Sequence, residues 1–102
     1  MLFLIKVSMP VESGNAAAKG GFKIIPQILE EQKPEAAYFV AENGMRTALL
    51  FIDMKDASQL PAIAEPWFLG VNASVEATPA MRPEDLQKAG PAVEQAVRKY
   101  AK

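Results

Sequence analysis

Lysine, glutamate and tyrosine are the side chains of this sequence that are best suited to acid–base chemistry. Lys6 lies in an apolar segment near the start, and Glu76 lies in a later segment in which apolar and polar residues alternate. If these two segments pair as neighbouring strands, the ammonium and the carboxylate become adjacent on one sheet face. Two interpretations of such a pair stay open: a structural ion pair, or a base and its partner with shifted pKa values. Tyr38 is likewise either an interface aromatic residue or a proton donor.

Several kinds of catalysis are excluded by residues that the chain lacks. With no histidine there is no imidazole base, no imidazole ligand for haem or metal, and no Ser-His-Asp triad. With no cysteine there is no thiolate nucleophile, no zinc–thiolate site and no disulfide framework. The Walker loop and the Gly-x-Gly-x-x-Gly fingerprint of nucleotide sites are missing as well. Carboxylates are numerous, but no motif pairs them, so we expect no metal site and no cofactor.

The composition is that of one folded globular domain. The chain has 102 residues, of which 50% are apolar and 23% charged, and this length leaves no room for a second hydrophobic core. We therefore expect a single domain over residues 1–102. The formal net charge is −1 and the basic residues are scattered, which disfavours nucleic-acid binding. The apolar start is too short for a membrane span and lacks the features of a signal peptide, so we expect a cytoplasmic protein with no membrane contact.

The first third of the chain predicts a strand and an imperfect helix. Residues 2–8 are rich in β-forming side chains and are followed by a proline, which cannot donate to a strand ladder. Within residues 12–32 the apolar side chains recur at helical spacing. Gly20-Gly21 and Pro26 weaken this helix, so we expect a kink or a loose first half.

A β-hairpin is the clearest local feature of the sequence. Residues 36–42 and 46–53 are two strand-like runs, and the dipeptide Asn43-Gly44 separates them. This dipeptide is strongly associated with the type I′ turn, which joins antiparallel strands through two residues.

The second half of the chain predicts a helix, a strand and a final helix. Asp56 is suited to cap a helix over residues 57–68, which Gly70 should end. Residues 71–78 alternate between apolar and polar side chains, which is typical of a strand with one buried face. From Arg82 onward, apolar residues at three- and four-residue steps predict an amphipathic helix that reaches the C-terminus.

These elements predict an α+β fold with a four-stranded antiparallel sheet and helices on one face. The whole chain resembles the dimeric α+β barrel superfamily, whose subunits are ferredoxin-like βαββαβ domains, here with a C-terminal helix. The stretches that carry the resemblance are similar to those of small uncharacterised bacterial proteins: residues 34–39, 46–48, 61–66 and 84–86. The resemblance implies a homodimer in which two sheets meet through their uncovered faces around a central cavity. It implies no established function.

Strand alternation predicts which side chains face the uncovered side of the sheet. The expected face has apolar walls and a few polar anchors: Leu4, Val40, Leu49 and Phe51 with Lys6, Tyr38, Thr47, Asn72, Ser74 and Glu76. Such a mixed face is typical of a dimer interface and also of a small-molecule cavity. Trp67 is either a core residue or the lip of that cavity. The candidate ligand-binding residues are therefore Lys6, Tyr38, Thr47, Trp67, Asn72 and Glu76.

Three functions remain open at this point. The first is a homodimer that binds a small, partly apolar ligand in a cavity between or beneath the sheets. The second is a cofactor-independent monooxygenase or isomerase acting on a small aromatic substrate; similar enzymes of the superfamily use asparagine, tyrosine, tryptophan and arginine, which occur here as Asn72, Tyr38, Trp67 and Arg46. The third is a protein-interaction module that uses the open sheet face. Whether the chain is an enzyme stays open.

Overall fold

The hairpin turn sets the register of the sheet in the computed structural model, which describes residues 1–102. Strand β2 spans Ala36–Glu42 and strand β3 spans Met45–Asp53, so the turn consists of Asn43 and Gly44 alone. Both turn residues have positive φ, 54° and 75°, as a type I′ turn requires. The two-residue turn is confirmed, and it places Val40 opposite Thr47.

The four strands form one antiparallel sheet in the order β2-β3-β1-β4. Strand β1 spans Leu2–Met9 and strand β4 spans Ser74–Pro79, and β1 pairs with both β3 and β4. The predicted α+β class and four-stranded antiparallel sheet are confirmed, and the strand order is compatible with a ferredoxin-like arrangement.

The helix predicted over residues 12–32 is in fact two helices. Helix α1 spans Val11–Lys19 and helix α2 spans Ile24–Gln32. Between them the chain reverses through Gly21 and Phe22, whose φ angles are 76° and 55°, and left-handed backbone of this kind ends a helix rather than bending it. Pro26 lies in the first turn of α2, where its missing N–H breaks no hydrogen bond.

The capping residue Asp56 starts the next helix as predicted. Its carboxylate accepts the backbone N–H of Ser58 at 2.8 Å. A short 3₁₀ turn, Ala57–Gln59, leads into helix α3, Leu60–Val71. The predicted end at Gly70 is wrong, because the left-handed residue that ends α3 is Asn72, with φ of 51°.

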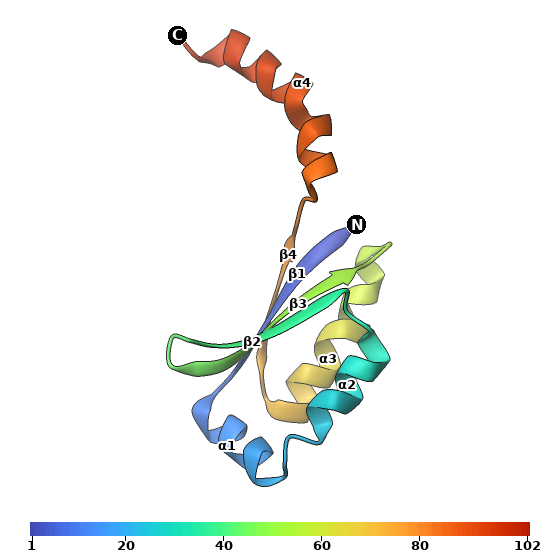
Figure 1. The fold of residues 1–102 in the computed structure, drawn as a ribbon, viewed down its shortest axis with the longest axis vertical. Helices are drawn as coiled ribbons and strands as arrows, with labels where there is room; N and C mark the ends of the chain where they lie inside the picture. Colours follow the sequence, from blue (N-terminus) through green and yellow to red (C-terminus); the bar gives the residue numbers. More distant parts are fainter.

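Helices α1, α2 and α3 cover one face of the sheet, and no helix covers the other (Figure 1). The core between them is centred on Trp67, Ile5 and Leu50, none of which is exposed to solvent. The indole N–H of Trp67 donates to the Gln32 side-chain oxygen at 3.2 Å, and the Gln32 amide nitrogen donates to the Ile63 carbonyl oxygen at 2.8 Å. This bridge fastens α3 to α2.

Helix α4, Pro83–Tyr100, stands away from the rest of the molecule (Figure 1). None of its residues is buried. The molecule measures 57 × 28 × 20 Å and its radius of gyration is 17.3 Å, whereas a compact chain of this length has a radius of about 13 Å. The helix itself was predicted, but the expectation that the helices lie on one sheet face holds only for α1, α2 and α3.

Replacing Trp67 by alanine should lower the free energy of unfolding by about 3–5 kcal/mol, because it empties the centre of the core and leaves Gln32 without its donor. Urea unfolding with an unchanged m-value measures this loss. Leu69→Ala is the matched control on the same helix, since Leu69 is 80% exposed and should change stability by less than about 0.5 kcal/mol. Equal losses in the two variants would contradict this view of the core.

Candidate functional site

A row of four side chains crosses the uncovered face of the sheet. Lys6 on β1 lies directly opposite Glu76 on β4 and directly opposite Leu49 on β3, and Leu49 lies opposite Tyr38 on β2. Residues directly opposite one another in antiparallel strands share a face. The structure thus brings Lys6, Tyr38 and Glu76 onto one surface. Strand alternation predicted this shared face, but the register that places Lys6 opposite Glu76 comes from the structure alone.

Two further rows flank this one, and together the three make up what we call the open face. They contain Ser74, Ser8, Thr47 and Val40 on one side, and Thr78, Leu4, Phe51 and Ala36 on the other. Thr47 is almost fully buried, and its hydroxyl donates to the Met45 carbonyl oxygen at 3.1 Å. Tyr38, at the edge strand, is 60% exposed. The open face therefore combines apolar side chains with hydroxyl, ammonium and carboxylate groups.

The ammonium of Lys6 contacts a carboxylate that lies two strands away. Its Nζ is 2.9 Å from the Glu42 carboxylate at the end of β2. The Glu42 hydrogen bond is the main cause that raises the pKa of Lys6, the Glu42 charge adds to it, partial desolvation opposes it, and Glu76 adds a weaker charge attraction. Lys6 and Glu76 are neighbours in register, but the direct partner of Lys6 is Glu42. An amine with a raised pKa stays protonated at neutral pH, so Lys6 is suited to electrostatic contact rather than to proton abstraction.

Two of the sequence candidates lie away from the open face. Asn72 was expected on it, but strand β4 begins two residues later and Asn72 forms the left-handed cap of α3. Trp67 lies in the core beneath the sheet with no exposed surface. Neither residue is brought next to Tyr38 or Lys6.

Arg46 lies on the helix side of the sheet, because it is opposite Met9, whose side chain is buried in the core. Its guanidinium lies over the Phe22 ring, 5.8 Å from the ring centroid, and donates to the Asn15 side-chain oxygen at 3.1 Å. The asparagine, tyrosine, tryptophan and arginine that the sequence offered for aromatic-substrate chemistry are thus held at separate places in the chain.

A groove that sequence reasoning missed lies between α2 and β2, on the helix side of the sheet. This α2–β2 groove has a volume of about 610 Å³, within the range of ligand pockets. Its lining is mostly apolar and includes Met9, Phe22, Ile25, Pro26, Leu29 and Phe39; Arg46 and Thr47 are its polar members. The alternation of side chains in β2 could have placed Phe39 on the helix side. Its 54% exposure there could not be foreseen, because it depends on where α2 packs.

Comparison with known proteins supplies no family: no family model, no curated protein and no solved structure matches this chain. No helix is both long and apolar enough to span a membrane. No acidic side chains are grouped in threes or more as metal ligands. The open face and the groove are therefore the two surfaces on which a function can depend.

Replacing Glu42 by glutamine should lower the pKa of Lys6 towards its ordinary value of 10.5, because the main cause of the shift is lost. Glu76→Gln is the matched control and should lower the pKa of Lys6 by less. The chemical shift of the Lys6 ε-carbon, followed by NMR against pH, measures the pKa in each variant. Because the folded-state pKa is raised, the stabilisation by this ion pair is complete below pH 10.5 and disappears as the pH rises through the raised value. A larger effect of Glu76→Gln would contradict this assignment.

Proposed function

We propose that the protein is a homodimer of ferredoxin-like subunits, in which two open faces meet and enclose a site for a small, partly apolar ligand. The observation that supports this most directly is the uncovered sheet face, which carries apolar side chains on both central strands. An antiparallel sheet with one solvated face normally places polar residues there. Here Leu4, Leu49 and Phe51 lie on that face instead, only partly buried within one chain. Apolar patches of this kind mark interaction surfaces.

The charges of the open face favour a ligand with a hydrogen-bond donor or a positive charge. The three rows of the open face carry one cation, Lys6, and one carboxylate, Glu76, and the Glu42 carboxylate reaches Lys6 from the end of β2. Because Glu42 already engages the ammonium at 2.9 Å, Glu76 is the charge left without a short ionic contact. In a dimer two such carboxylates line the enclosed space. We infer a ligand with an apolar body and an amine or other donor group, in preference to a carboxylic acid.

The dimer predicts that wild-type protein has twice the chain mass in size exclusion with light scattering, and keeps it on dilution. Leu49→Asp should produce monomer, because each copy would bury an additional carboxylate at the centre of the interface, opposite a lysine that Glu42 already engages. Leu69→Asp, which changes an exposed leucine on α3, is the matched control and should leave the dimer intact. Wild-type protein that is monomeric throughout the dilution series would refute the proposed dimer.

Phenethylamine and phenylacetate test the ligand class, since they share an apolar ring and carry opposite charges. At equal concentration the amine should raise the thermal midpoint more, because only a bound ligand stabilises the folded state. Glu76→Gln should abolish the advantage of the amine. Glu31→Gln, on the exposed side of α2, should preserve it. A rise with phenylacetate that equals or exceeds the rise with the amine would exclude the proposed ligand class.

A further inference from the structure

Helix α4 carries an apolar stripe that none of the other elements buries. At 100° per residue, its leucine, valine and tyrosine side chains and two of its alanines fall on one face: Leu86, Ala89, Val93, Ala96, Val97 and Tyr100. No charged residue lies within this arc. Leu86, Val93, Val97 and Tyr100 are between 55% and 81% exposed. Gly90 and Pro91 lie in the interior of this helix and weaken it, so it is marginally stable in water by itself and its stripe gains from a surface to pack against.

The α2–β2 groove is an apolar surface to which such a helix can bind. Edge strand β2 has no helix over Phe39, and α2 presents Ile25 and Leu29 towards the hollow. Amphipathic helices bind such grooves through anchors at i, i+3, i+4 and i+7. In α4 the four apolar residues from Val93 to Tyr100 have this spacing.

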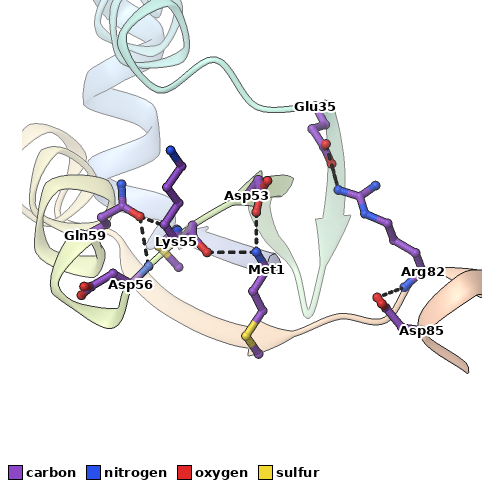
Figure 2. Close-up of polar contacts among 9 residues, drawn as sticks. Met1, Glu35, Asp53, Lys55, Asp56, Gln59, Arg82 and Asp85 are labelled. Atoms are coloured by element: carbon purple, nitrogen blue, oxygen red, sulfur yellow. Dashed lines mark hydrogen bonds and ion pairs between the residues drawn. The ribbon is translucent and has the colours of Figure 1, made fainter. Parts of the chain in front are cut away.

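The segment between β4 and α4 directs the helix away from its own groove. Arg82 precedes a proline, which restricts it to extended backbone, and its φ and ψ are −80° and 162°. Its guanidinium donates to both Glu35 carboxylate oxygens at 2.9 Å (Figure 2). The backbone N–H of Ala80 also donates to the Leu2 carbonyl oxygen at 2.9 Å. These contacts hold the chain extended along the sheet up to the residue before α4.

We therefore propose that α4 of each chain packs its apolar stripe into the α2–β2 groove of a second copy, in a reciprocal exchange. This inference rests on the proposed homodimer and adds a contact outside the open faces. Such an exchange is isologous, because each copy donates one helix and receives one.

The area available supports a second copy as the occupant. A helix of this length is about 27 Å long and about 10 Å across, so one face covers roughly 270 Å². Giving one helix and receiving another doubles this footprint for each chain, to roughly 540 Å², against the roughly 800 Å² that each partner buries in a standard interface. Contact between the open faces supplies the rest.

Disulfide trapping tests the exchange, because the chain has no cysteine of its own. Full-length Val93→Cys and Phe39→Cys are purified separately, mixed in denaturant, refolded together and oxidised mildly. Only contact between chains can join these two cysteines. The matched control is Gln95→Cys mixed with Phe39→Cys, since residue 95 lies on the opposite side of α4. We expect roughly tenfold more mixed disulfide from position 93, because docking holds the two thiols at high effective concentration.

Equal yields from positions 93 and 95 would overturn the exchange, provided that circular dichroism shows each variant folded. Val97→Cys with Ala41→Cys repeats the test at a second pair, so failure of one variant to fold does not decide it. A double variant, Val93→Cys with Phe39→Cys in one chain, that forms only monomeric disulfide would show α4 in its own groove and would also overturn the proposal.

The experiments distinguish failure of the helix exchange from failure of the open-face dimer. A wild-type dimer that Leu49→Asp dissociates, but that forms no mixed disulfide from position 93, keeps the open-face contact and removes the exchange. Mixed disulfide that persists in Leu49→Asp protein, with the dimer mass retained, keeps the exchange and removes the open-face contact.

Discussion

Burial of one face of the central strand β1 is the constraint on which the rest of the structure depends. Ile5 and Val7 are completely buried, opposite Leu50 and Ala48 of β3, which are also completely buried. Because side chains alternate along a strand, this burial forces Lys6 and its neighbours onto the other face. Helices α1, α2 and α3 are enough to cover β1 and β3 but leave β2 exposed along its length. The open face and the α2–β2 groove are the two surfaces left by this partial cover.

On the open face, an ion pair between Lys6 and Glu42 joins strands β1 and β2 across β3. Glu42 ends β2, Lys6 lies at the middle of β1, and β3 runs between these strands. An ion pair over β3 therefore ties the exposed edge of the sheet to its centre. Its surface position limits the contribution to stability, but it defines where charge lies on the open face. Glu76, directly opposite Lys6, has no short ionic contact of its own, and in the proposed dimer it is the carboxylate offered to the ligand.

Features decided by local rules could be predicted from the sequence. The Asn43-Gly44 turn and the alternation of β1 each depend on a few adjacent residues, and the structure agrees with both. Asn72 was misplaced because the alternation over residues 71–78 begins before the strand does. Val71 is buried as the last residue of α3, and β4 starts only at Ser74. The direct partner of Lys6 depends on how two non-adjacent strands meet, which no local pattern contains. At the start of α4, Arg82 contacts Glu35, which is 47 residues earlier, so no local pattern indicates where this helix points.

The proposed contacts reinforce one another energetically. Contact between two open faces brings the second copy close, so the docking of α4 then occurs at high effective concentration rather than as a separate encounter. Neither surface needs to be strongly adhesive by itself. The stripe on α4 and the α2–β2 groove are each apolar. Their contact lowers the free energy of the dimer by roughly 25 cal/mol for each Å² of apolar surface that is withdrawn from water. The same contact also stabilises a helix that is marginal when isolated. In the proposed dimer, a helix held away from its own core by the extended Arg82 segment completes its fold on a second copy.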